Sequence, residues 1–364
     1  MLENDWARLL ANKKRNIFET LVYFLLHLLS GLYAIGVDGK NLFFKLGFVK
    51  QVVFKTKIIS VGNLTVGGTG KTPFVEAMCK RLLRNGKNVL VVAKGYKRKK
   101  LNKIDVVSNG EKLLLDCSFA GDEPYMIARN VPKAKVVVGT DKIKAIKYGV
   151  ETFKPEVVLL DDGFQKRHNL KASANVVLIN ALNPFGYGYL FPAGLLREKV
   201  SALAEADVVV LTNVNLMSDP SKLKRIKDII LTHNKNIKIF HATHEPKEVY
   251  NINTSEKHAP AFLKNKKVIA FSSIGNPAGF EKTLKQLGAR ILFGFYYGDH
   301  HAFKKKELEG IAQVYKKSSA DFVITTEKDE VRIKMEFLAT APVYALKIGM
   351  VIPQFADLDK VLKV

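Results

Sequence analysis

The sequence contains little cysteine. Its 364 residues include two, Cys79 and Cys117, which are too few for a disulfide framework or for a zinc site made of four thiolates. We therefore expect a reducing compartment and ordinary core thiols. Internal repeats and long low-complexity tracts are also missing from the sequence. The hydrophobic content of 47%, with 25% charged residues, is typical of a folded protein and excludes a disordered chain.

Acidic residues are also scarce. The chain has 34 acidic residues against 58 basic ones, a formal net charge of +24. Such a surface favours an acidic partner, which could be nucleic acid, an anionic membrane or a phosphorylated substrate. The basic residues comprise 47 Lys and only 11 Arg, whereas guanine is read mostly by arginine. Because zinc-finger, helix-turn-helix and base-stacking signatures are missing from the sequence, we expect no nucleic-acid partner.

One apolar segment near the start suggests a membrane. Residues 17–37 are almost continuously apolar, and Lys13, Lys14 and Arg15 precede them. As a helix this segment is long enough to cross a bilayer, so a cleaved signal peptide, a spanning helix and an interfacial helix all compete. Spanning would place the rest of the chain outside the cell under the positive-inside rule. We favour an interfacial helix, with a buried helix packed on the main domain as the alternative.

After residue 50 the sequence alternates between short apolar β-branched runs and helix-length segments. This alternation predicts an α/β fold in which helices cover both faces of a parallel sheet. A helix is expected over 73–84. The expected strands share continuous apolar character and lie at 57–61, 88–93, 136–138, 157–160, 176–179 and 208–211, with a second set from 268–272 to 322–326.

These patterns predict the domain organisation. Residues 1–50 form an N-terminal membrane-associated helical segment, and residues 51–225 form a phosphate-loop core. The polar, Lys- and Asn-rich residues 226–265 are expected to be a linker. Residues 266–364 are expected to form a smaller α/β lobe.

The strongest chemical signal lies at residues 61–72, which read Val-Gly-Asn-Leu-Thr-Val-Gly-Gly-Thr-Gly-Lys-Thr. A glycine-rich turn between a strand and a helix lets backbone amides surround a phosphate. Lys71 would reach the β- and γ-phosphates, and the Thr72 hydroxyl would bind Mg²⁺. The strict phosphate-loop pattern has glycine where this chain has Thr65. We nevertheless predict a nucleotide site made of Thr65, Val66, Gly67, Gly68, Thr69, Gly70, Lys71 and Thr72.

Two acidic pairs are candidates for the remaining chemistry. Asp161 and Asp162 follow an apolar strand, where a phosphate-loop enzyme places a metal-organising carboxylate; a pair of helix N-caps is the alternative. Asp122 and Glu123 stand in Gly-Asp-Glu-Pro, which could supply a general base or could merely begin a helix. The run 299–301, Asp-His-His, could likewise be a tuned base or a solvated turn.

Together these motifs resemble the tetraacyldisaccharide 4'-kinase family of lipid A biosynthesis. The resemblance spans residues 61 to 332. It rests on the phosphate loop, on Gly-Asp-Glu-Pro and on further motifs at 161–165 (Asp-Asp-Gly-Phe-Gln), 192–198 (Pro-Ala-Gly-Leu-Leu-Arg-Glu), 274–277 (Ile-Gly-Asn-Pro), 299–301 and 326–329 (Thr-Glu-Lys-Asp). It implies an ATP- and Mg²⁺-dependent kinase that phosphorylates the 4'-hydroxyl of tetraacyldisaccharide 1-phosphate to form lipid IVA. It also implies a monomeric enzyme on the cytoplasmic face of the bacterial inner membrane.

The resemblance further implies residue roles. Asp122 corresponds to the catalytic base and is paired with a histidine that we place at His300 rather than His301, while Lys71 serves the phosphates. Metal-organising oxygens are expected from Thr72, Glu123, Asp161 and Asp162, and which of the two aspartates contacts Mg²⁺ stays open. Substrate contacts are expected at Tyr96, Gln165, Arg197 and Glu198.

The chain departs from the family pattern at three positions. Lys94 and Lys142 stand where arginine is usual, and Lys166 stands where histidine is usual. Positive charge is kept, but a planar guanidinium fork is lost at the first two positions. A membrane-recruited nucleotide switch without a phosphoryl acceptor is the competing function. It would explain the phosphate loop and Asp161–Asp162 but not Gly-Asp-Glu-Pro or Arg197–Glu198.

Overall fold

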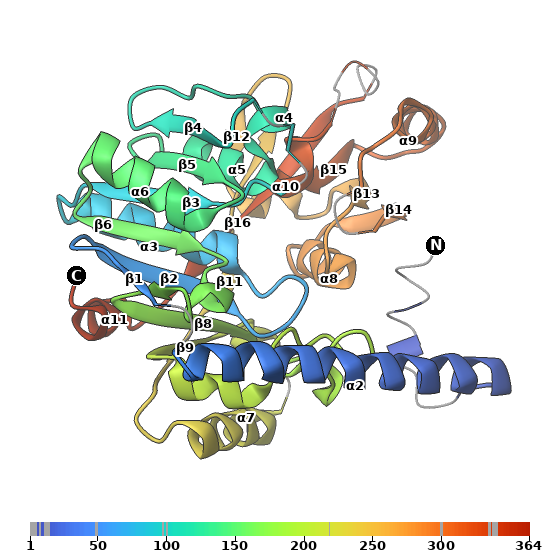
Figure 1. Cartoon of the computed structure of the whole chain (residues 1–364). Coiled ribbons are helices and arrows are strands. Elements are labelled where there is room, and N and C mark those ends of the chain that lie inside the picture. Colours follow the sequence, from blue (N-terminus) through green and yellow to red (C-terminus); the bar gives the residue numbers. More distant parts are fainter. Residues whose placement is uncertain are drawn as a thin grey trace. The chain divides into compact units, whose positions relative to one another are not determined.

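The computed structural model describes residues 6, 9–10, 15–47, 50–96, 98–99, 101–217, 219–298, 301–333, 336 and 341–364. The chain divides into two compact units. Unit 1 comprises residues 1–243 and 350–364, and unit 2 comprises residues 244–349. Figure 1 shows both, with β-sheets flanked by helices in each.

An eight-stranded sheet forms the centre of unit 1, in the order β10-β9-β8-β2-β6-β3-β5-β4. Every neighbouring pair is parallel except the edge pair β4–β5. The strands are β2 (Lys57–Asn63), β3 (Val89–Ala93), β4 (Ile104–Asn109), β5 (Lys135–Gly139), β6 (Val157–Asp161), β8 (Ala174–Asn180), β9 (Val208–Thr212) and β10 (Lys238–His241). A separate parallel pair joins β1 (Val52–Val53) to β7 (Leu170–Lys171).

Alternate strand residues enter separate hydrophobic clusters, as the pleat requires. Ile59 packs in a cluster with residues from α3 (Lys71–Arg84), α5 (Asp122–Asn130) and the C-terminal helix α11 (Phe355–Leu362). Its neighbour Ile58 packs in another cluster with residues from α6 (Lys142–Phe153). Residues of α7 (Pro220–His233) pack with residues of β8 and β9. The predicted parallel sheet with helices on both faces is confirmed.

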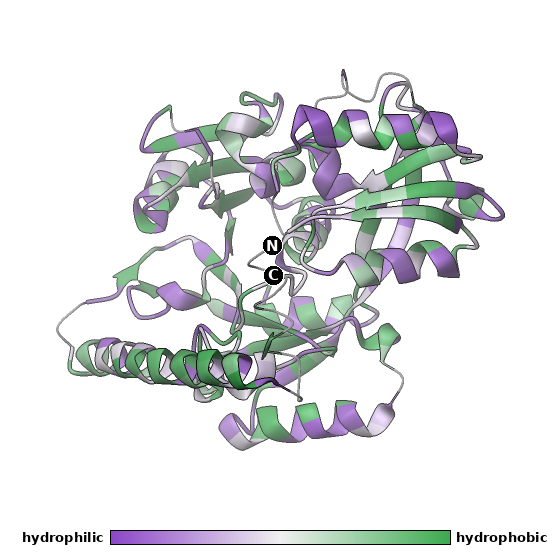
Figure 2. Ribbon diagram, turned by 90° about the vertical axis from the view of Figure 1, so that its right-hand side faces the viewer, coloured by the Kyte–Doolittle hydropathy of each residue, from purple (hydrophilic) through white to green (hydrophobic). Residues whose placement is uncertain are grey.

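Helix α2 (Ile17–Lys45) begins at an Asn16–Glu19 capping box. Figure 2 shows hydrophobic residues over most of its length. In the most apolar 18-residue stretch of this helix, only 11% is buried. The side chains of Phe18, Leu21 and Leu32 are 73%, 65% and 61% exposed. This exposure contradicts the alternative of a buried packing helix. By length and composition α2 could also cross a membrane, so exposure alone does not choose between an interfacial and a spanning helix.

Unit 2 contains a six-stranded sheet in the order β12-β11-β16-β15-β13-β14. Its strands are β11 (Thr243–Asn251), β12 (Lys257–His258), β13 (Lys267–Ser272), β14 (Arg290–Tyr296), β15 (Phe322–Thr326) and β16 (Val343–Val351). Helices α8 (Pro277–Gln286) and α9 (Lys305–Lys317) each contribute to a core. Two short α-helices are also present, α4 (Cys117–Ala120) in unit 1 and α10 (Glu327–Glu330) in unit 2.

The predicted domain boundaries need two corrections. Residues 226–265 are not a linker, because they contain most of α7, strands β10 to β12 and a short 3-10 helix, Pro260–Leu263. Their polar texture arises because α7 buries only Ile226 and Ile230 and because β10 and β12 are edge strands. In addition, residues 350–364 return to unit 1 instead of ending the smaller lobe.

The return of α11 gives a test of this architecture. Leu358 is fully buried in the unit 1 core, so Leu358→Ala should destabilise the protein by about 2–4 kcal/mol through lost burial and a residual cavity. The adjacent Asp357, whose exposed side chain pairs with exposed Lys360, provides the control. Asp357→Ala should change the free energy of unfolding by less than about 0.5 kcal/mol. Urea unfolding measures both, and equal effects would refute this role of α11.

Candidate active site

The phosphate loop joins the end of β2 to the start of α3. Gly67 and Gly70 have φ values of 104° and 86°, which side chains disfavour. Thr69 is buried, and its hydroxyl accepts a hydrogen bond from Asn63 Nδ2 at 2.9 Å. Its carbonyl accepts another from Thr212 Oγ1 at 3.0 Å. The N-cap of α3 is Gly70, which has no side chain to cap the helix, so backbone N–H groups there are available to a phosphate.

Thr65 replaces the usual glycine without strain. It forms an isolated antiparallel bridge with Leu196 and is not among the residues with positive φ. Two backbone hydrogen bonds flank the bridge, from Val66 N to Leu195 O and from Arg197 N to Leu64 O, both 2.7 Å long. The backbone therefore does not need a positive φ at this position, and a side chain there causes no backbone strain. The same pairing brings the Arg197 side chain to the phosphate loop.

Asp162 is the more strongly paired of the two aspartates after β6. Its carboxylate accepts hydrogen bonds from both terminal nitrogens of Arg197, at 2.8 and 3.2 Å, and lies 3.6 Å from Lys71 Nζ. Arg197 also donates to Asn63 Oδ1. Burial opposes ionisation, but the Arg197 hydrogen bonds and the Lys71 charge prevail and hold the pKa of Asp162 well below its ordinary value.

Asp161 has the opposite electrostatic environment. Its side chain is almost fully buried, and Oδ1 has no hydrogen-bond partner within the described chain. Burial, reinforced by the charges of Glu123 and Asp162, raises the pKa of Asp161 to about 7. Lys142 Nζ donates to the backbone carbonyls of Asp161 and Asp162 at 2.8 and 2.5 Å, so its charge is not placed on the carboxylate itself. Burial lowers the pKa of Lys142.

The unpartnered Asp161 oxygen fits a cation site. The structure shows no cluster of three or more acidic, His or Cys side chains suited to a metal among its described residues. Mg²⁺ needs no such cluster, because it commonly takes one or two protein oxygens and completes its shell with water and phosphate oxygens. Asp161 and Thr72, the second residue of α3, are suitable donors. This makes Asp161 a better candidate than Asp162, whose oxygens are held by Arg197.

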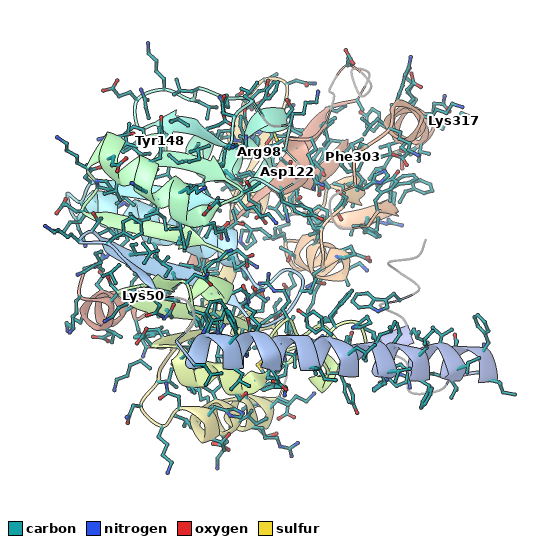
Figure 3. The ribbon with its side chains drawn as sticks, in the orientation of Figure 1. Lys50, Arg98, Asp122, Tyr148, Phe303 and Lys317 are labelled. Atoms are coloured by element: carbon teal, nitrogen blue, oxygen red, sulfur yellow. The ribbon has the colours of Figure 1, made fainter. Side chains whose placement is uncertain are left out.

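Asp122 and Glu123 occupy the first turn of α5, and Figure 3 labels Asp122 there. The preceding Gly121 has a φ of 86°, and a Cβ at this position would lie only 3.0 Å from Gly95 Cα. That close approach brings the Tyr96 backbone, after β3, beside the start of α5. Cys117 Sγ lies 3.5 Å from Asp122 Oδ1. Both cysteines were predicted to be core thiols; Cys79 is buried as predicted, but Cys117 is only half-buried.

Gln165 and Glu198 differ in accessibility. Gln165 Nε2 donates to Asn63 O at 2.8 Å, and Gln165 and Arg197 border a groove of about 340 Å³. The Glu198 side chain is only 3% exposed and forms a 3.1 Å ion pair with buried Arg167. Its position favours a structural role beside the groove over direct substrate contact. The groove is lined by Tyr33, Gly36, Val37, Lys40, Gln165, Arg197 and Glu198.

The histidine candidates belong to unit 2. His300 lies outside the described residues, together with Asp299. His301 is described, and its Nε2 lies 2.8 Å from Glu307 Oε2. Its ring stacks on Tyr297 with the centroids 4.9 Å apart. These contacts occupy His301 within its own unit.

Sequence reasoning missed three residues that shape this site. Asn63 and Thr212 end strands β2 and β9 and hold the phosphate loop. Their position as polar residues after apolar strands was an available signal. The sequence marked Lys142 only as a departure from the family pattern. Its contact with the carbonyls of Asp161 and Asp162 depends on where α6 begins, and hydrophobic periodicity does not locate that residue.

A phosphate loop, a strand-end carboxylate pair and further acids meet at the carboxyl edge of one parallel sheet. This arrangement defines the class of phosphate-loop nucleotide-binding phosphotransferases.

Comparison with known proteins specifies the family. The family model described as tetraacyldisaccharide-1-P 4'-kinase (LpxK) matches residues 22–363. The tetraacyldisaccharide 4'-kinase of Elusimicrobium minutum is 37% identical, over 96% of this chain and 92% of that one. The enzyme of Halothermothrix orenii is 33% identical, over 92% and 89%. The chain belongs to the tetraacyldisaccharide 4'-kinase family and is a kinase.

A solved structure agrees with this assignment. The crystal structure of LpxK from Aquifex aeolicus in complex with ATP is 30% identical to this chain and superposes with a TM-score of 0.74. The match covers 94% of this chain and 98% of that one. The predicted fold class is therefore confirmed over both units.

The raised pKa of Asp161 predicts a pH dependence of stability. Between its ordinary value of 3.8 and about 7, the folded protein holds a proton that the unfolded chain has released, so stability falls as pH rises through this window. Asp161→Asn removes the effect. From about pH 5 to about pH 8, the variant should lose less stability than wild type by on the order of 2 kcal/mol.

Urea unfolding in EDTA, without nucleotide, measures this difference. Exposed Glu151→Gln on α6 is the control and should follow wild type at each pH. A parallel pH course for Asp161→Asn and wild type would show that the Asp161 carboxyl is not the group responsible.

Proposed function

We propose that the protein transfers the γ-phosphate of ATP to the 4'-hydroxyl of tetraacyldisaccharide 1-phosphate, which forms lipid IVA. The observation that supports this most directly is the joining of the phosphate-loop Lys71 to the Asp162–Arg197 pair, with Arg197 bordering a groove that residues of the apolar helix α2 also line. A nucleotide switch needs the phosphate loop but has no use for a lipid-side groove. The family assignment also favours the kinase over the nucleotide switch.

In this mechanism the chain's own residues bind and orient the phosphates. The backbone amides of the phosphate loop and the N-terminus of α3 hold them, and Lys71 reaches the transferring group. Asp162 fixes Lys71 and Arg197 in place. Asp161 and Thr72, with Glu123 nearby, would hold a Mg²⁺ ion that arrives with ATP, and that ion would neutralise charge on the phosphate oxygens.

Asp122 is the proposed base that accepts the proton of the acceptor hydroxyl, and His300 is its proposed partner. Tyr96, next to Gly121, and Gln165 and Arg197, at the groove, are the proposed substrate contacts. Glu198 is proposed to position this surface through Arg167.

Membrane attachment is proposed to be peripheral, on the cytoplasmic face. Ser30, near the middle of α2, donates to Leu190 O at 2.9 Å, and Tyr33 donates to Arg197 O at 3.1 Å. Lys199 pairs with Asp38 at 2.6 Å. A helix held to the kinase unit along this length would lie in the interface with its apolar side in lipid, rather than cross it. We further propose that the enzyme acts as a monomer without nucleic acid.

A phosphoryl-transfer assay tests the kinase. With γ-labelled ATP, Mg²⁺ and detergent-dispersed tetraacyldisaccharide 1-phosphate, wild type should produce a bisphosphorylated lipid. Lys71→Ala and Asp122→Asn should each reduce transfer by at least about 100-fold, because they remove phosphate stabilisation and the proton acceptor. Glu151→Gln should retain wild-type transfer. ATP hydrolysis without labelled lipid, unchanged in Asp122→Asn, would instead support the nucleotide switch.

The exposed face of α2 predicts membrane attachment. Replacing Leu21, Leu25 and Leu32, which are 65%, 52% and 61% exposed, with serine should move the protein from the membrane pellet to the supernatant. Their apolar area would no longer be buried in lipid. Binding of a fluorescent ATP analogue should be unchanged, since none of the three lies at the phosphate loop. A variant that still pellets fully would contradict attachment through this face.

A further inference from the structure

The segment Leu182–Pro192, here called the aromatic loop, exposes several large side chains that the proposed reaction does not use. Tyr187, Tyr189 and Phe191 are 42%, 49% and 42% exposed, and Leu182 is 45% exposed. Single exposed apolar residues are ordinary, but a contiguous group on one short loop marks an interaction surface.

The aromatic loop is fastened along α2. Ser30 Oγ, which is buried, donates to Leu190 O at 2.9 Å. The Tyr189 ring meets His27 edge-on with centroids 4.6 Å apart, and the Phe191 ring meets Tyr33 at 6.5 Å. The rings of Tyr189 and Phe191 therefore adjoin the apolar helix, so the loop and the helix form one surface.

The chemistry of this surface matches the boundary of a bilayer. Tyrosine rings combine an apolar body with a polar hydroxyl and are enriched where hydrocarbon meets water. Trp6, the single tryptophan of the chain, adds a third such ring, with its Nε1 donating to Pro192 O at 3.1 Å and its ring 5.7 Å from Phe191.

Charge identifies the kind of bilayer. The Arg15 guanidinium lies 3.6 Å above the Tyr23 ring at the start of α2, directly after Lys13 and Lys14 in the sequence, and the whole chain carries a net charge of +24. Anionic phospholipid headgroups complement this charge. A second copy of the chain would instead bring like charges together.

We propose that the aromatic loop is a second membrane-contacting element, which enters the headgroup region of an anionic bilayer beside α2. This inference rests on the membrane attachment in the proposed function and not on the phosphoryl-transfer step.

The other side of the aromatic loop continues into the active site. Leu190 forms a parallel bridge with Leu196, and the segment after the loop pairs with the phosphate loop through Leu195 O and Val66 N. A second contact beside α2 would add to the constraint that the apolar face of the helix provides, and would further restrict the orientation of the phosphate loop toward the lipid surface.

Fluorescence quenching by brominated phospholipids tests the contact directly. Phe191→Trp in a Trp6→Phe background places the only indole on the aromatic loop, and the conservative exchange should preserve folding. Vesicles of phosphatidylethanolamine and phosphatidylglycerol, with bromines near the top of the acyl chains, should quench it. The matched control is Tyr148→Trp in the same background; Tyr148 is 40% exposed on α6 and labelled far from α2 in Figure 3. Absence of quenching at position 191 would overturn the proposal.

Vesicle binding provides a second readout. Replacing Tyr187, Tyr189 and Phe191 with serine should weaken partitioning into the same vesicles by at least about tenfold. The control variant replaces Leu113, Leu114 and Tyr148 with serine. These side chains are 43%, 50% and 40% exposed, and the variant should bind the vesicles as wild type does.

Three outcomes are decisive for this comparison. Equal binding by the two triple variants would overturn the proposal, as would concentration-dependent self-association of wild type, without vesicles, that the aromatic-loop variant abolishes. Weaker binding with an unchanged thermal midpoint and unchanged binding of the fluorescent ATP analogue would support it. Because these measurements need no lipid acceptor, a failure of the proposed kinase reaction would be seen separately.

Discussion

The bidentate ion pair between Asp162 and Arg197 joins three parts of unit 1 that are distant in the sequence. Asp162 follows β6 with a φ of 50°, Arg197 pairs through its backbone with the phosphate loop, and Lys71 begins α3. Removing either partner would leave a partly buried charge with weaker compensation, which costs more than losing a fully exposed pair. The geometry of the phosphate loop therefore depends on this pair as much as on its glycines.

Arginine is used selectively in this lysine-rich chain. Among its 11 arginines, several hold buried or half-buried carboxylates where a rigid fork satisfies both oxygens or several acceptors at once. These pairs are Arg98–Asp105, Arg167–Glu198, Arg197–Asp162 and Arg332–Asp329. Lys142 differs from these arginines, because its ammonium group donates to two backbone carbonyls. A single ammonium group can make both hydrogen bonds, so a guanidinium is not needed there.

The parallel strands and the phosphate loop could be predicted because local pattern determines them: β2 and β6 are continuous apolar runs followed by turn or acidic residues. The edge strands β10 and β12 and the exposed helix α7 could not, since few of their residues are buried and polar composition resembles that of a linker. Acidic pairs were recognised, but their unequal roles were not. The burial of Asp161 and the ion pair between Arg197 and Asp162 depend on tertiary contacts, which the local sequence does not predict. The return of α11 likewise depends on long-range packing.

The outward apolar face of α2 has a consequence for how this kinase meets its acceptor. An enzyme attached to a membrane surface by this helix would search for its lipid acceptor by lateral diffusion in two dimensions. ATP would reach it by diffusion in three dimensions. Encounter frequency would then follow the surface density of acceptor rather than its amount per volume of cytoplasm. Diluting the membrane with inert lipid should slow such an enzyme even when the total acceptor is unchanged.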